Sequence, residues 1–150
     1  TLLYSGLFYA CGLVGVFISG QSADRMGERK WHCVFGQAAT ALFLAGSAMT
    51  AGQPFVVVMT WLCLTGFTTY FWPSPFWALP TLTLTASAAA VSIGFINMCA
   101  NLAGWLGNYQ MGWLRSHGYS ERDCLFYLAG CYFLGAVLIS LVKIQRPQRK

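Results

Sequence analysis

The chain has 150 residues, of which 57% are hydrophobic and only 9% charged, and its net charge is +5. A soluble domain carries about a quarter charged residues, so this composition excludes an ordinary globular protein. Residues 33–114 contain no Asp, Glu, Lys or Arg, and residues 1–23 and 124–142 are equally free of charge. Because one membrane crossing needs roughly 20 mostly apolar residues, the sequence predicts several membrane-spanning helices.

Five spans are predicted, at residues 2–20, 33–51, 55–80, 86–114 and 124–142. A polar connector, 21–32, holds five charges and separates the first two spans. A tight turn through Gly52 and Pro54 follows the second span. The segment 119–123 is interpreted as a turn with an N-cap before the last helix. The predicted fold class is an all-α polytopic membrane protein that ends in a basic tail, 143–150.

Most basic residues lie in two clusters, one in the connector 21–32 and one in the tail 143–150. Basic flanks of membrane spans mark the cytoplasmic side, and placing both clusters there makes the five spans alternate consistently. We therefore expect an integral, multi-pass protein of a bacterial inner (plasma) membrane. No nucleic-acid partner is expected, because no soluble domain would present the basic residues. The first residues are apolar without a basic leader, so we expect no signal peptide and a chain truncated at its N-terminus.

Six cysteines show no C-x-x-C spacing and mostly fall inside apolar runs, so we interpret them as small core residues. His32 and His117 fall in predicted connectors without partners suited to metal binding or catalysis, and surface positions are expected for both. We therefore expect no cofactor, no metal site and no catalytic residue, so the chain is not expected to be an enzyme.

Small residues recur every four positions on the fourth span, at Ala86, Ala90 and Gly94. Small side chains let helices approach closely in lipid, so this spacing predicts tight packing within a bundle. A mobile, sliding interface is the alternative, and the spacing does not decide between the two.

The connector and its flank follow the pattern G-x-x-x-D-R-x-G-x-R-K, formed by Gly20, Asp24, Arg25, Gly27, Arg29 and Lys30. The glycines permit tight turns, Asp24 suits the positive N-terminal end of a neighbouring helix, and the basic residues suit anionic headgroups. An ordinary basic membrane flank would have similar residues. Between two spans, however, this connector resembles the loop of major facilitator superfamily transporters.

Three further stretches resemble the anion:cation symporter family within that superfamily: G-E-R-K-W-H from Gly27, P-F-W-A-L-P-T from Pro75 and I-N-M-C-A-N-L-A-G from Ile96. Three alanines at 88–90 add to the resemblance. It implies the major facilitator fold, with this chain as a partial C-terminal six-helix bundle that holds helices 8 to 12 of twelve. One departure is Gly107-Asn108-Tyr109, where the family often has Gly-Pro-Tyr.

Asn97 and Asn101 lie four residues apart, so both amides project from one helix face. An amide in hydrocarbon needs a partner, which is either a neighbouring helix or a substrate in a wet cavity. The resemblance favours substrate contact for Asn97 in particular.

Pro73 and Pro75 remove two backbone donors from the third span, and such broken helices are tolerated where they line protein or a cavity. We expect Ser74 and Trp77 at that cavity and Trp72 as an interfacial anchor. The predicted substrate-binding residues are Asn97, Trp77, Ser74, Asn101, Tyr70 and Gln37.

The predicted function is secondary active transport of a small organic anion (a sugar acid, dicarboxylate or aromatic acid) by alternating access, coupled to a proton or sodium. No Asp, Glu, His, Lys or Arg lies inside a predicted span, so we expect coupling and charge recognition in the missing N-terminal half of the same transporter. The alternatives are a non-transporting membrane sensor, a channel-like bundle, a membrane enzyme and an assembly subunit.

Overall fold

The computed structural model describes residues 2–50 and 52–142, and over these residues it contains helices and connections without any strand. The helices are α1 (Leu2–Met26), α2 (Arg29–Met49), α3 (Phe55–Thr69), α4 (Pro73–Thr83), α5 (Ala86–Ser116) and α6 (Glu121–Leu141). With α3 and α4 taken together, five segments are long and apolar enough to cross a membrane. The predicted all-α polytopic class with five spans is confirmed, while Ala51 and the tail 143–150 lie outside the described residues.

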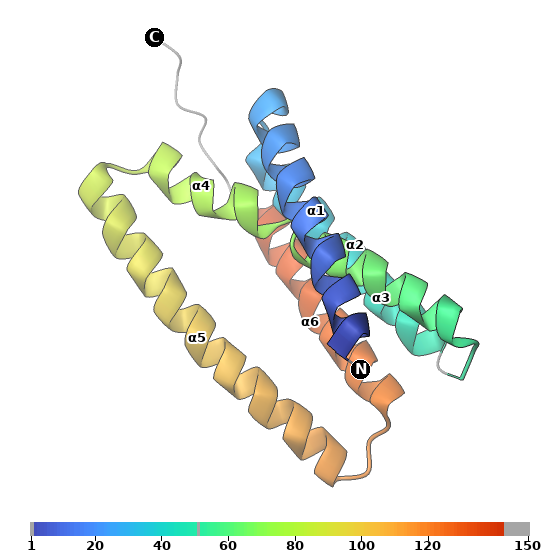
Figure 1. Ribbon diagram of the computed structural model, residues 1–150. Coiled ribbons are helices and arrows are strands. Elements are labelled where there is room, and N and C mark those ends of the chain that lie inside the picture. The colour runs from blue at the N-terminus through green and yellow to red at the C-terminus, as the bar shows by residue number, and fades with distance from the viewer. Residues whose placement is uncertain (1, 51, 143–150) are drawn as a thin grey trace.

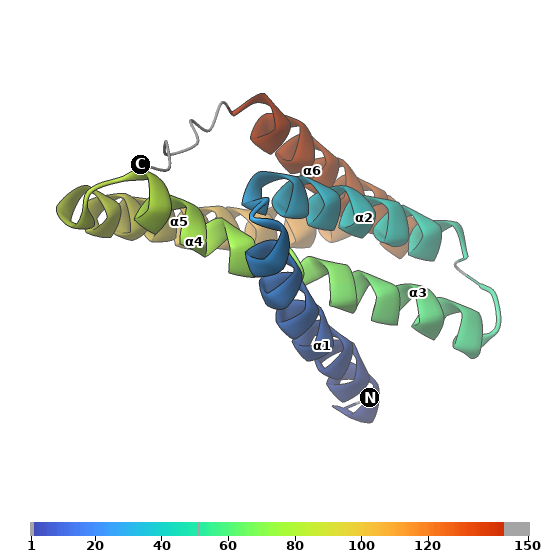
Figure 2. The ribbon, with the colours of Figure 1, turned by 90° about the horizontal axis from the view of Figure 1, so that it is seen from above.

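The helices run back and forth between two ends of the molecule (Figure 1). The α1–α2 and α4–α5 connections lie at one end, and the α2–α3 and α5–α6 connections lie at the other. Viewed from above, α2 lies between α6 and α3 (Figure 2), and α1 packs on α3. These four helices form the packed part of the molecule.

Close approach of α1 and α3 depends on glycines from both helices. A Cβ at Gly15 would collide with the backbone carbonyl of Phe67, and a Cβ at Gly66 would lie 2.6 Å from the carbonyl oxygen of Phe8. Only a residue without a side chain fits such contacts, which is how helices in lipid gain packing contact. Gly36 acts similarly on α2, where a Cβ would lie 2.9 Å from Cβ of Trp72.

The fourth predicted span, now α5, stands apart from the packed helices (Figure 1). Ala89 is the one residue of α5 that the described chain buries. Ala86 and Ala90 are exposed, and a Cβ at Gly94 would meet nothing within 4 Å. The predicted tight packing through these three residues is therefore wrong for the described chain, because no described helix covers that face of α5.

The predicted polar connector 21–32 is mostly helical. Helix α1 continues to Met26 and α2 begins at Arg29, so two residues, Gly27 and Glu28, form the turn. Gly27 has a φ of +65°, a left-handed conformation that glycine adopts without strain, and its N–H donates to the Ala23 carbonyl oxygen over 3.0 Å.

Two local predictions at the other end of the molecule are confirmed. Ser120 is the N-cap of α6, where its Oγ accepts from the Asp123 N–H over 3.2 Å and the Asp123 carboxylate accepts from the Ser120 N–H over 2.9 Å. This reciprocal pair satisfies two backbone donors that the helix leaves free. The turn after α2 passes through Gly52, which has a φ of +89°, and Pro54 precedes α3.

Candidate functional site

The third predicted span is broken between α3 and α4, and the break is held by side chains of neighbouring helices. Pro75 has no N–H, so the Phe71 carbonyl four residues earlier lacks its helical donor. The Ser19 hydroxyl from α1 donates to this carbonyl instead. Cys33 of α2 donates its thiol to the Trp72 carbonyl over 3.6 Å. The Phe71 carbonyl that Pro75 leaves without a helical donor is therefore satisfied inside the protein. The Cys33 thiol adds a second contact to a Trp72 carbonyl that already accepts from the Phe76 N–H over 3.3 Å.

Three predicted site residues lie at this break. The ring of Tyr70 packs on Gly12 of α1, and the Ser74 hydroxyl oxygen lies 3.1 Å from where a Cβ on Gly20 would be. Trp77 is half-buried and meets Phe76 edge to face, with 5.4 Å between ring centroids. Tyr70 and Ser74 thus face α1.

Trp72 does not match its interpretation as an interfacial anchor. Its indole Nε1 is buried and has no hydrogen-bond partner among the described residues. An anchor at the membrane surface places that N–H in the wet headgroup region. Here the side chain instead packs on Gly36 of α2 and edge to face on Phe76, at 5.5 Å between centroids. The anchor prediction is wrong because the break turns Trp72 inward.

Gln37 lies elsewhere, within the contact between α2 and α6. Its side chain is only 8% exposed, and its amide oxygen occupies the space that a Cβ on Gly135 would need. Gln37 therefore fills the α2–α6 interface, whose close approach Gly135 permits.

Asn97 and Asn101 share the exposed surface of α5, as their spacing predicted. The Asn101 amide donates to the backbone carbonyl of Asn97 over 2.8 Å. The Asn97 side chain makes no hydrogen bond to any residue in 2–50 or 52–142. The six predicted residues thus occupy three separate places: the α3–α4 break, the α2–α6 interface and the outer surface of α5.

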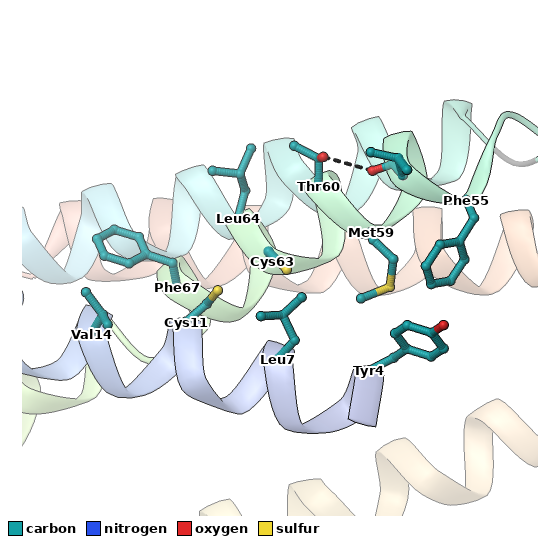
Figure 3. A pocket seen from close by; sticks show the side chains of 11 residues that line it. Tyr4, Leu7, Cys11, Val14, Phe55, Met59, Thr60, Cys63, Leu64 and Phe67 are labelled. Carbon is teal, nitrogen blue, oxygen red and sulfur yellow. Dashed lines mark hydrogen bonds between the residues drawn. The ribbon is translucent and has the colours of Figure 1, made fainter. Parts of the chain in front are cut away.

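An apolar groove of about 570 Å³ lies between α1 and α3 and contains none of the predicted residues (Figure 3). Its lining is Tyr4, Leu7, Cys11, Val14, Phe55, Val56, Met59, Thr60, Cys63, Leu64 and Phe67. The Thr60 hydroxyl already donates to the Val56 carbonyl over 2.8 Å, so the groove presents little that would fix an anion. Sequence reasoning missed this groove, although the spacing of positions 4, 7, 11 and 14 marks one helix face.

The connector motif joins three helices at the end that carries α1's last turn. Asp24 accepts from Arg29 over 2.6 Å, and Lys30 donates to the Ser140 carbonyl of α6 over 2.7 Å. Arg25 lies exposed in the last turn of α1, where a positive charge suits the helix dipole. The motif therefore ties α1, α2 and α6 together.

His32 contradicts its predicted surface position. The side chain is buried in α2, its Nδ1 contacts the Glu28 carbonyl, and its Nε2 lies 3.0 Å from the Ser22 hydroxyl. The ring also stacks on Phe71 at 6.0 Å with a 7° interplanar angle. The reason is that α2 begins at Arg29, so His32 stands on the packed face of the helix one turn before Gly36. His117 is exposed just after α5, as predicted.

Within residues 2–50 and 52–142, no group of three or more His, Cys, Asp or Glu side chains is placed to hold a metal ion.

The known proteins that are similar to this chain are named as transport proteins. The chain is 31% identical over 137 residues to a protein of Agrobacterium vitis named as a candidate tartrate transporter, a match that covers 91% of the chain and 30% of that relative. It is 30% identical over 148 residues to a quinolone resistance transporter of Acinetobacter baumannii, covering 97% of the chain and 33% of the relative. A candidate metabolite transport protein of Pseudomonas putida is 28% identical over 127 residues.

The chain spans about a third of the length of these relatives. No protein-family model matches the chain, and no solved structure matches it.

Proposed function

Because this chain belongs to a family of bacterial membrane transporters, we propose that it forms the C-terminal part of a major facilitator transporter of the anion:cation symporter family. The whole protein moves a small organic anion, such as a sugar acid, dicarboxylate or aromatic acid, by alternating access. The observation that carries this proposal is the match to named transporters over 85–97% of the chain.

Recognition of the anion in this chain rests on neutral hydrogen bonding and aromatic surface. Asn97 and Asn101 present exposed amides on α5 that no helix within residues 2–50 and 52–142 covers, and Trp77 offers a half-buried indole beside the α3–α4 break. Amide and indole N–H groups donate to carboxylate oxygens. We assign these three residues to substrate contact.

The other three predicted contacts support that surface. Tyr70 and Ser74 pack on glycines of α1, and Gln37 packs on Gly135 of α6. We therefore propose that they hold the broken helix and α2 in place, so that the α5 and Trp77 groups keep their positions.

Both coupling and charge recognition are proposed to lie outside this chain. Each Asp, Glu, Lys and Arg among the described residues stands at or beside a helix end. Coupling to a proton or sodium, and pairing with the substrate's negative charge, need an ionisable group inside the pathway. The N-terminal part of the same transporter would supply these groups.

The connector motif is proposed to lie in the cytoplasm, at the inner membrane of a bacterium. Arg25, Arg29 and Lys30 gather at this end, and basic residues favour the cytoplasmic side. Asp24, already paired with Arg29, braces one access state through a helix end or a basic residue of the other half.

Reconstitution of the full-length protein in proteoliposomes tests the proposal. Labelled tartrate, gluconate and benzoate are offered under an imposed proton or sodium gradient. The proposal predicts that at least one carboxylate accumulates above its external concentration and that an ionophore abolishes this accumulation. A channel would let the anion equilibrate without accumulation, and a sensor would move none of the three. Either result would overturn the proposal.

A further inference from the structure

Two aromatic rings on α5 continue the line of the amide pair. Trp105 and Tyr109 follow Asn97 and Asn101 at the same spacing of four residues, which keeps successive side chains adjacent along the helix. The two rings stack with 6.1 Å between centroids and a 17° interplanar angle. Both side chains are 63% exposed, so no described helix uses them for packing.

The depth of these rings distinguishes them from membrane anchors. Helix α5 has 31 residues, about 46 Å of length, and the hydrocarbon layer is about 30 Å thick. With α5 centred on that layer, its middle residue Asn101 lies at the midplane. Trp105 then lies about 6 Å from the midplane and Tyr109 about 12 Å, both within the hydrocarbon depth.

Aromatic anchors occur further along the same helix and look different. Trp113 lies about 18 Å from the midplane, at headgroup depth. It stacks on His117, with 4.1 Å between centroids, and lies 6.5 Å from Tyr119. Trp105 lies too deep to reach the headgroup region, and lipid tails cannot accept a hydrogen bond from its indole N–H. A wet, substrate-containing space satisfies both the N–H and the exposed ring face.

We propose that Trp105, supported by the stacked Tyr109, is a specificity-determining residue that holds the planar ring of an aromatic carboxylate. Asn97 and the remaining N–H of Asn101 donate to the carboxylate, one to two helical turns away. This inference rests on the proposed function and narrows its substrate from three classes of organic anion to one, the aromatic acids. The π-faces of Trp105 and Tyr109, rather than the size of these side chains, favour aromatic acids.

Benzoate and cyclohexanecarboxylate isolate the effect, because they share charge and carbon skeleton and differ in the aromatic ring. Uptake of labelled benzoate by the full-length protein in proteoliposomes is measured while each unlabelled acid, and tartrate, competes. We expect benzoate to compete best. Stacking on one aromatic ring predicts that Trp105→Leu reduces the preference for benzoate over cyclohexanecarboxylate by about threefold to tenfold. Trp105→Phe should retain most of the preference, and the control Trp113→Leu should leave it unchanged.

Three results overturn the inference. Equal competition by cyclohexanecarboxylate and benzoate would remove the role of the ring. An equal loss of the benzoate preference in Trp105→Leu and Trp113→Leu would show that both substitutions act on the general stability of the protein and not on ring recognition. Uptake of tartrate or gluconate without benzoate would refute the aromatic class and leave the proposed function standing, whereas absence of uptake for every carboxylate would refute the proposed function itself.

Discussion

The close contact between α1 and α3 predicts that Gly66→Ala destabilises the protein. A Cβ at this position would lie 2.6 Å from the Phe8 carbonyl oxygen and 3.0 Å from Cδ2 of its ring. The backbone oxygen cannot move aside alone, so the two helices must separate. Overpacking of this kind costs about 1–3 kcal/mol, against a gain of about 1 kcal/mol for alanine over glycine in a helix.

Gly94→Ala is the matched control, because it makes the same substitution within a helix where a Cβ would meet nothing within 4 Å. The propensity gain is common to both variants, so their difference isolates the clash, about 1–3 kcal/mol. We expect Gly66→Ala to melt about 1–3 °C below Gly94→Ala when the full-length protein is heated in detergent and followed by fluorescence-detected size exclusion. Equal melting temperatures would refute the close approach of α1 and α3.

Three further outcomes are expected. Ser120→Ala removes the hydroxyl that caps α6 together with Asp123, and should lower the melting temperature of the full-length protein by about 1–2 °C, while an unchanged temperature would show that the cap does not stabilise the helix. Cys11 and Cys63 face each other across the α1–α3 groove (Figure 3). A copper-phenanthroline oxidant should therefore form a disulfide between them in full-length protein whose other cysteines are serine. Absence of this disulfide would contradict the close approach of α1 and α3. Asp24→Asn should slow uptake by shifting the balance of access states while substrate affinity in detergent stays nearly intact, and an unchanged uptake rate would count against the brace.

Local chemistry was sufficient to predict the membrane-spanning segments, the cap of α6 and the transporter family. Charge-free runs of span length have one stable environment, and Ser120 three residues before Asp123 is sufficient for a capping pair. The kinship with transporters predicted from the connector motif is confirmed by the relatives, which are named as transporters.

The positions of His32, Trp72 and Gln37 could not be predicted, because burial depends on which helix face meets a neighbour. The charged residues around His32 predict a connector, yet α2 begins three residues before it and places it on the packed face of the helix. The preference of tryptophan for membrane interfaces predicts an anchor at Trp72, whereas the proline break directs its indole into the protein. Local sequence does not determine which face of α2 packs against its neighbours, and it does not determine the direction of the chain at the α3–α4 break.

The predicted site residues show the same division. Asn97 and Asn101 share a helix face because their spacing requires it, and the structure agrees. Whether Tyr70, Ser74 and Trp77 meet those amides depends on how α5 sits against the rest of a longer transporter, which spacing within one helix does not encode.

Thiol labelling of α5 tests most directly the claim that its amide face borders a water-filled transport pathway. Cys99 and Asn97 are two residues apart and therefore point about 200° from each other around the helix. In full-length protein whose other cysteines are serine, we compare native Cys99 with the Asn97→Cys variant in which residue 99 is also serine. We expect a water-soluble methanethiosulfonate reagent to modify position 97, the transported carboxylate to slow this modification, and Cys99 to stay unmodified. Modification of Cys99 with no reaction at position 97 would contradict this claim.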